Sequence, residues 1–166
     1  LEVLKKLLND EIKAKQSKNV VKARQFSEML EGTLLRYQNR TLEAAQIILE
    51  LIDLAKQMRE DGKRPPPLDK LTDDEIAFYD ALADHGDVKN LMGDQVLAAI
   101  AHDLVEAIRT SVSIDWTQKE AVRADMRRKV KRLLRKHGYP PDKREEAVLT
   151  VIEQAEVVCR DWARAA

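Results

Sequence analysis

The chain has 166 residues, of which 35% are charged and 4% are aromatic. Lysine plus arginine number 29, as do aspartate plus glutamate, so the net charge is zero and excludes a bulk attraction for nucleic acid. No apolar run reaches the roughly 18 residues that a membrane span needs, so we expect no membrane segment and no signal peptide. The single cysteine, Cys159, excludes an internal disulfide, and we expect a cytoplasmic protein in which this thiol is buried.

Helix-forming residues dominate the composition, and the alternation typical of strands is almost absent, so we expect an all-α fold. Apolar residues at helical spacing predict about seven helices in an irregular bundle. The first three helices are expected at Glu2 to about Lys15, at about Val20 to Tyr37, and from an N-cap at Thr41 to about Glu60.

A proline-rich segment, Asp61–Pro67, separates the third helix from the rest of the chain. Its glycine and three consecutive prolines break helical structure, and the prolines are expected to stiffen it into an extended spacer. We interpret it either as a hinge between two lobes or as a strap across one. The predicted sub-lobes are residues 1–61 and 69–166, with residues 62–68 as the linker.

Four further helices are expected after this linker. Thr72 and Glu75 have the spacing of a capping box, which opens a short helix to about Ala83. Asp94 is expected to cap a helix that runs to about Ser111. A strongly basic helix follows at residues 119–137, and a last one is expected from Pro141 to about Ala163.

The basic helix has clear start and stop signals. Thr117 and Glu120 form a second capping box, and Gly138 with the prolines at 140 and 141 ends the helix. An apolar stripe is predicted to face the core, and it consists of Val122, Met126, Val130, Leu133, Leu134 and His137. The remaining surface is a basic face that consists of Arg123, Arg127, Arg128, Lys131, Arg132, Arg135 and Lys136.

Charge is distributed unevenly along this neutral chain. Lys119–Arg144 holds eleven basic and three acidic residues, a local charge of +8, whereas Asp69–Glu106 holds two basic and ten acidic residues, a local charge of −8. One interpretation is that these two solvated faces attract each other within the fold. The other is that the basic face binds phosphate or an acidic partner.

No pattern typical of an active site is present. The five glycines are scattered and none has the context of a phosphate-binding loop. The acidic run Asp73–Glu75 is explained by the dipole of a helix first turn, and no histidine has a second ligand at zinc spacing. We therefore predict no catalytic residue, no cofactor-binding residue, no metal site and no small-molecule substrate, and we expect His102 to be a hydrogen-bonded structural histidine.

Three aromatic residues are candidates for docking a partner, namely Trp116, Tyr139 and Trp162. Trp116 precedes a helix start and is more simply expected to pack on Ala121. Trp162 either anchors the last helix or lies on a patch that faces a partner. Tyr139 is expected at a rim, where ring and hydroxyl are both used, and the same is expected of Tyr37 and Tyr79.

The stretch SIDWTQKEAVRADMRRKVKRLLRKHGYPPD, from Ser113 to Asp142, resembles the closing segment of the restriction (motor) subunit of type I restriction–modification enzymes. The segments Lys18–Met58 and Leu71–Asp84 resemble the same region. The resemblance implies that residues 1–166 are a single C-terminal helical module of a larger subunit. It implies that the parent protein is an ATP-dependent type I site-specific deoxyribonuclease that uses ATP and Mg, while its nuclease and ATPase residues lie outside this chain.

The resemblance also implies the partners, which are the methyltransferase and specificity subunits of the same enzyme, with DNA in the full complex. The leading hypothesis is a non-catalytic assembly module that docks the motor subunit onto the methyltransferase–specificity core. An alternative is a sequence-independent contact of the basic helix 119–137 with the DNA backbone. A third is a purely intramolecular scaffold, in which the basic helix pairs with the region Asp69–Glu106 and high salt lowers the melting temperature.

Overall fold

The structure is a computed structural model, and it describes residues 1–40, 42–110 and 119–165. These residues form eight α-helices and one 3-10 helix without a strand among them, which confirms the all-α prediction. The elements are α1 (Glu2–Gln16), α2 (Val20–Gln38), α3 (Ala44–Glu60), η1 (Leu68–Lys70), α4 (Asp73–Ala83), α5 (Val88–Met92), α6 (Asp94–Arg109), α7 (Lys119–Lys136) and α8 (Pro141–Ala165).

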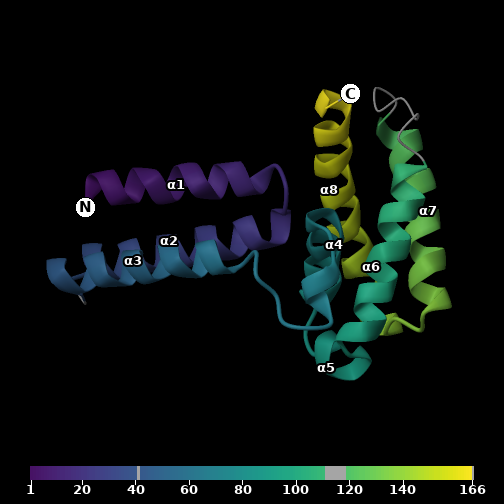
Figure 1. Cartoon of the computed structure of the whole chain (residues 1–166), viewed down its shortest axis with the longest axis horizontal. Coiled ribbons are helices and arrows are strands. Elements are labelled where there is room, and N and C mark those ends of the chain that lie inside the picture. Colours follow the sequence, from purple (N-terminus) through teal and green to yellow (C-terminus); the bar gives the residue numbers. More distant parts are fainter. Residues whose placement is uncertain (41, 111–118, 166) are drawn as a thin grey trace.

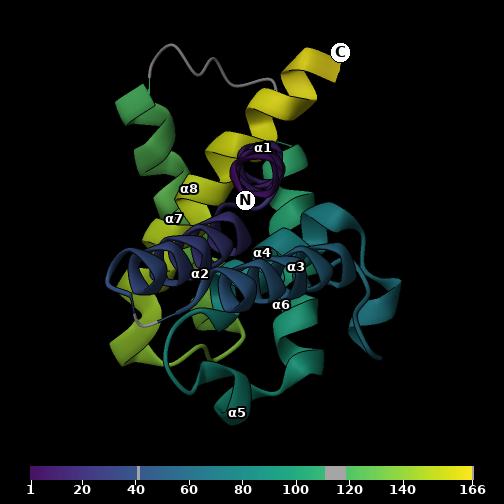
Figure 2. The same cartoon turned by 90° about the vertical axis from the view of Figure 1, so that its left-hand side faces the viewer.

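The helices lie in two groups (Figure 1). Helices α1, α2 and α3 lie side by side and project to one side, and Figure 2 views this group from its free end. Helices α4–α8 form the other group, in which α6 and α7 run steeply across the direction of α1. Helix α4 is the centre of the second group, because all residues from Glu75 to Leu82 are buried.

Two clusters of buried apolar residues correspond to these groups. The first core cluster, which includes Phe78, Leu104 and Cys159, fills the space among α4, α6, α7 and α8. The second core cluster lies within α1–α3 and consists of Leu8, Ile12, Phe26, Leu30, Ile47, Leu51 and Leu54. Helix α2 contributes Val21 to the first cluster and Phe26 to the second, so the division into sub-lobes 1–61 and 69–166 stays a prediction.

The strongest local signals are where the sequence places them. The hydroxyl oxygen of Thr72 accepts from the backbone N–H of Glu75 at 3.2 Å, and the carboxylate of Glu75 accepts from the backbone N–H of Thr72 at 3.0 Å. Helix α7 ends at Lys136, and Gly138 has a φ of 73°, the left-handed backbone expected of a helix stop. The other predicted capping box rests on Thr117, which lies outside the described residues.

Two predicted N-caps are wrong. Helix α3 begins at Ala44 with Glu43 as its N-cap, where Gln46 Oε1 accepts from the backbone N–H of Glu43 at 3.0 Å. Thr41, the predicted cap, lies outside the described residues. Asp94 is the first residue of α6 rather than its N-cap, which is Gly93, and the Asp94 carboxylate instead accepts from the Tyr79 hydroxyl at 2.6 Å.

The linker also differs from its prediction. The chain turns at Pro66 and Pro67 and continues directly into η1, so the expected extended spacer is wrong for these residues. Arg64 attaches the linker to α4, because its guanidinium donates to both carboxylate oxygens of Asp80 at 2.9 and 2.8 Å. The short helix α5, between the predicted fourth and fifth helices, was not anticipated.

Candidate functional site

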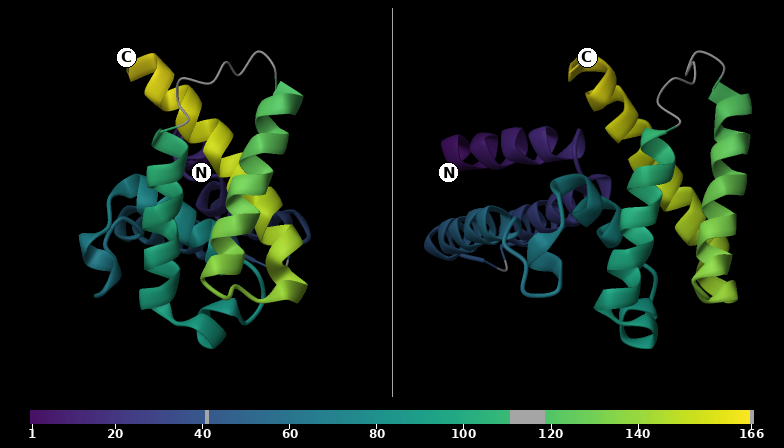
Figure 3. Two further views of the ribbon diagram at one scale, coloured as in Figure 1. Left: turned by 90° about the vertical axis from the view of Figure 1, so that its right-hand side faces the viewer. Right: turned by 45° about the vertical axis from the view of Figure 1, so that its right-hand side comes forward.

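Helix α7 has one buried face and one open face. Val122, Met126, Val130 and Leu134 are buried, which confirms that the predicted apolar stripe faces the core. Helices α6 and α8 are the neighbours of α7, and Figure 3 shows α7 beside α6 with α8 crossing behind them. The opposite face of α7 therefore points into solvent.

Two of the predicted basic residues are used inside the fold. The Arg123 guanidinium lies 3.0 Å from the carboxylate of Glu156, and the Lys131 ammonium lies 3.0 Å from that of Glu145. Both glutamates belong to α8. These cations therefore fasten α7 to α8, an arrangement in which partly exposed ion pairs contribute little individually to stability.

The remaining five cations form what we call the outer basic strip, which consists of Arg127, Arg128, Arg132, Arg135 and Lys136, all of them exposed. Arg128 lies 3.9 Å from Asp125 on the same helix, and its side chain keeps 75% of its surface exposed. The other four form no ion pair with any residue of the described ranges 1–40, 42–110 and 119–165. Arg123 and Lys131 thus contribute to the packing of α7 on α8, whereas the outer basic strip is exposed to solvent and accessible to a binding partner.

The acidic region Asp69–Glu106 contacts His137, the residue that follows α7, whose Nε2 lies 2.8 Å from Asp103. Other carboxylates of that region have partners elsewhere. Glu75 pairs with His102 at 2.7 Å, Asp74 lies 3.8 Å from Arg109, and Asp80 binds Arg64. Among the ion pairs of the described residues, this contact just beyond the end of α7 joins the two charged regions, while Arg123 and Lys131 of α7 pair with α8.

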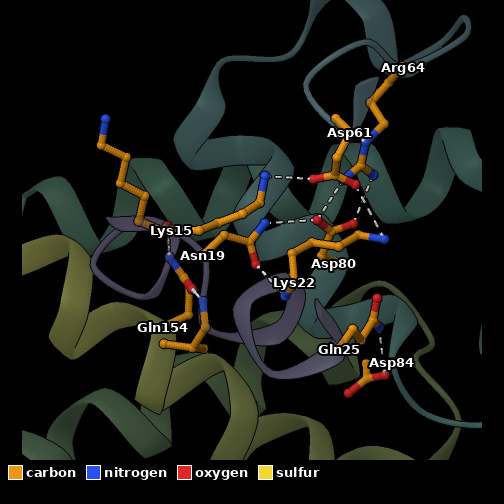
Figure 4. Close-up of polar contacts among 11 residues, drawn as sticks. Lys15, Asn19, Lys22, Gln25, Asp61, Arg64, Asp80, Asp84 and Gln154 are labelled. Atoms are coloured by element: carbon orange, nitrogen blue, oxygen red, sulfur yellow. Dashed lines mark hydrogen bonds and ion pairs between the residues drawn. The ribbon is translucent and has the colours of Figure 1, made fainter. Parts of the chain in front are cut away.

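A second polar cluster lies where α1, α2 and the linker meet α4 and α8 (Figure 4). We call it the polar junction, and it consists of Lys15, Asn19, Lys22, Asp61, Arg64, Asp80 and Gln154. Asp80 accepts from Asn19 Nδ2 at 2.9 Å in addition to its two bonds from Arg64. Gln154 Oε1 accepts from the backbone N–H of Val20 at 2.9 Å, and Gln154 Nε2 donates to the carbonyl of Lys18 at 2.8 Å.

Three cations surround the carboxylate of Asp61 in this junction. Lys15 lies at 2.9 Å, Arg64 at 3.3 Å and Lys22 at 3.5 Å. Burial alone would raise the pKa of Asp61, but the hydrogen bond from Lys15 and the charges of all three cations lower it below its ordinary value. The hydrogen bond from Arg64 to Asp80 favours the charged guanidinium and raises the pKa of Arg64 above its ordinary value. No local sequence pattern indicates this cluster, because its members come from five separate segments of the chain.

The three aromatic residues predicted to dock a partner differ in what the structure shows of them. Tyr139 is fully buried, and its hydroxyl donates to the carbonyl of Leu82 at 2.7 Å, so its predicted rim position is wrong and it offers no surface to a partner. Tyr79 is likewise buried, and burial is the main cause that raises its pKa. Trp116 lies outside the described residues, as does the side chain of Trp162, whose backbone belongs to α8.

Several apolar residues on and next to α1–α3 are exposed, which the sequence-based predictions did not include. Val3, Leu35 and Leu49 each expose more than half of their surface, and the exposed apolar residues of this group are Leu1, Val3, Leu7, Met29, Leu35, Ile48, Leu49 and Ile52. The sequence feature that could have indicated this exposed surface is the broad apolar face of α3, because only part of such a face can pack against α1 and α2. Met29 and Leu49 also line a groove between α2 and α3.

Within the described ranges, no group of three or more His, Cys, Asp or Glu side chains could hold a metal ion. No helix among the same residues is long and apolar enough to cross a membrane. His102, which the sequence predicts to be structural, is hydrogen-bonded to Glu75 through Nδ1.

Comparisons with known proteins agree on one family. Residues 1–161 match the family described as "Type I restriction enzyme HindI endonuclease subunit-like, C-terminal". The type I restriction enzyme HindI endonuclease subunit of Haemophilus influenzae is 42% identical over 158 residues, which cover 95% of this chain and 15% of that protein. The putative type I restriction enzyme MjaIXP endonuclease subunit of Methanocaldococcus jannaschii is 31% identical over 138 residues, which cover 82% of this chain and 13% of that protein.

No solved structure matches the chain. The chain spans 15% and 13% of the length of the two relatives, so it corresponds to a small part of each. Because the family match extends over nearly the whole sequence, the chain belongs to the family of C-terminal regions of HindI-like type I restriction enzyme endonuclease subunits.

Proposed function

We propose that this chain is a non-catalytic assembly module of an ATP-dependent type I restriction endonuclease. In this role it docks the motor and nuclease subunit onto the methyltransferase–specificity core in the cytoplasm. The parent polypeptide would supply the nuclease and ATPase chemistry together with the ATP and Mg sites. Membership of the C-terminal family supports the placement within the subunit.

The observation that carries the docking role is the apolar surface of α1–α3. Leu49 is 66% exposed and Val3 is 74% exposed, and further apolar side chains of the same three helices accompany them. Exposed apolar side chains gathered in one region of a molecule mark surfaces that another protein covers. Burying them against a partner removes apolar area from water, which is the main source of favourable free energy in protein association.

Co-elution on size exclusion tests this proposal. The purified chain is mixed with its cognate methyltransferase–specificity core without DNA, and we expect the two to elute together. The variants Val3→Glu, Leu35→Glu and Leu49→Glu place a charge on α1, α2 and α3 and are expected to abolish co-elution. Leu91→Glu is the matched control, because Leu91 is 72% exposed on α5, away from this surface.

Separate elution of a wild-type chain that is folded by circular dichroism would contradict the docking role. Loss of co-elution in the Leu91 variant alone would move the docking surface to the other group of helices.

A further inference from the structure

We propose that the outer basic strip of α7 binds the phosphate backbone of double-stranded DNA without reading its sequence. This contact goes beyond the docking role, since it concerns a different partner and a different face of the molecule. The five cations of the strip are exposed, and the internal ion pairs of α7 with α8 are made by Arg123 and Lys131 instead. The fold itself therefore leaves the strip available.

The spacing of the strip suits a row of phosphates. Arg128, Arg132 and Arg135 follow one another at helical spacing along the centre of the exposed face, and seven residues of helix extend over about 10 Å. A DNA duplex carries one negative charge in about 1.7 Å of its axis, so several phosphates lie within reach at once. A guanidinium also forms two parallel hydrogen bonds with a phosphate, which favours arginine at such contacts.

The composition of the exposed face favours DNA over an acidic protein. Protein interfaces depend on a few buried aromatic or large apolar anchors. Besides its cations, the exposed face of α7 offers Glu120 and the small side chains of Ala121 and Ala124. Because none of these is aromatic, the exposed face has no aromatic ring to stack on a base, and in a duplex the bases are already stacked on one another. We therefore expect the binding to depend mainly on charge.

Fluorescence anisotropy with a labelled duplex tests the proposal across a series of salt concentrations. If all five cations meet phosphates, the logarithm of the binding constant falls with a slope of about 4.5 against the logarithm of salt. Binding then weakens about 500-fold between about 50 and about 200 mM salt. In the triple variant Arg128→Gln, Arg132→Gln and Arg135→Gln, we expect this slope to fall by about 2.7.

The matched control removes the same charge elsewhere. Lys6, Lys13 and Lys56 are exposed on α1 and α3, and their replacement by glutamine also removes three positive charges. The control variant is expected to keep the wild-type slope and to bind more tightly than the strip variant. Both variants should keep the wild-type melting temperature, because glutamine is a good helix former on an exposed helix surface.

Three outcomes would overturn the proposal. The first is that the wild-type chain binds no duplex at the lowest salt concentration. The second is that the two triple variants lose binding equally, which would attribute binding to the overall charge rather than to the strip. The third is that polyglutamate, used as a competitor, displaces duplex from the wild-type chain at a lower charge concentration than unlabelled duplex does, which would indicate an acidic protein as the partner. The co-elution experiment contains no DNA, so the docking role stands or fails independently of these results.

Discussion

Asp80 is the residue on which the polar junction converges. Its carboxylate receives two bonds from Arg64 and one from Asn19, and it is buried. Asp80→Asn removes the buried charge that pairs with Arg64 and leaves the guanidinium only its longer, 3.3 Å contact with Asp61. We therefore expect the free energy of unfolding to fall by about 3 kcal/mol. Urea unfolding followed by circular dichroism measures this change.

The control for Asp80 is Asp10→Asn, which makes the same substitution at an exposed position of α1. This change is expected to stay within about 0.5 kcal/mol of the wild type. Equal losses in the two variants would mean that Asp80 is no more important than a surface carboxylate.

His102 and Glu75 give stability a defined pH dependence. The hydrogen bond to Glu75 raises the pKa of His102 above its ordinary value of 6.5. Burial would raise the pKa of Glu75, but hydrogen bonds from Thr72 and His102 lower it below its ordinary value of 4.5. The histidine contribution is complete below its ordinary pKa and is lost as pH rises through the raised pKa, whereas the glutamate contribution is lost as pH falls through its lowered pKa.

We therefore expect His102→Gln to lower the melting temperature in the window between about pH 4.5 and about pH 6.5, and to have little effect at about pH 9. Thermal melts of both proteins across this range measure the difference, and a nuclear magnetic resonance titration of His102 reports its pKa directly. An identical shift in melting temperature at every pH would show that the charged pair contributes nothing.

Single residues illustrate what a sequence reveals about a site. Side-chain type and helical spacing were enough to predict that five cations of α7 are exposed and that His102 is hydrogen-bonded, whereas a role of those cations in binding stays a prediction. They could not tell that Arg123 pairs with α8, while Arg132 forms no ion pair with the part of the chain that the structure describes. That distinction depends on where α8 places Glu156 and Glu145, which is a matter of tertiary packing.

At the scale of the element, two glycines are expected to respond in opposite directions to alanine. Gly138 has a φ of 73°, so Gly138→Ala is expected to cost about 1 kcal/mol through backbone strain alone, since its new methyl group would meet no atom within 4 Å. Gly32 lies inside α2 with equally open surroundings, so Gly32→Ala is expected to stabilise the protein by about 0.5–1 kcal/mol. Urea unfolding of the pair checks both signs, and a shared sign would contradict the role given to Gly138.

Helix ends were predictable where the signal was local and strong. The capping box joins Thr72 to Glu75, three positions away, and at the helix stop the backbone N–H of Gly138 donates to the carbonyl of Arg135, also three positions away. The start of α3 was missed because Glu43 with Gln46 can satisfy the first turn as well as a threonine can. Helix α5 has five residues, too few to show a periodic pattern.

At the scale of the whole molecule, Gln154 links α8 to the start of α2. Both groups of its buried amide bond backbone atoms near residue 19, and Val20 is 134 positions away in the sequence. Gln154→Ala leaves an N–H and a carbonyl without partners, so we expect the free energy of unfolding to fall by about 2–3 kcal/mol in urea.

Gln25 provides the comparison for Gln154. Its amide lies 3.4 Å from Asp84 at the same boundary, but this contact is exposed. Gln25→Ala is expected to stay within about 0.5 kcal/mol of the wild type. Similar losses for the two glutamines would indicate that the buried amide does not hold the two groups of helices together.

The arrangement of the helices could not be predicted from the sequence, because it depends on contacts between segments that lie far apart in the chain. Composition and periodicity established the all-α class and the identity of most helices. The turn at Pro66 and the polar junction arise from contacts between distant segments, such as Arg64 with Asp80 and Asn19 with Asp80. No local pattern encodes those contacts.

Because Cys159 is buried, chemical modification of its thiol reports when the first core cluster opens. This thiol is 4% exposed within the first core cluster, and the sequence contains no other cysteine. A thiol reagent reaches it when α8 separates from its neighbours, so the rate of modification counts openings of the core rather than encounters at the surface. Slower labelling upon addition of a partner would therefore reveal, without any engineered probe, that binding steadies the interior.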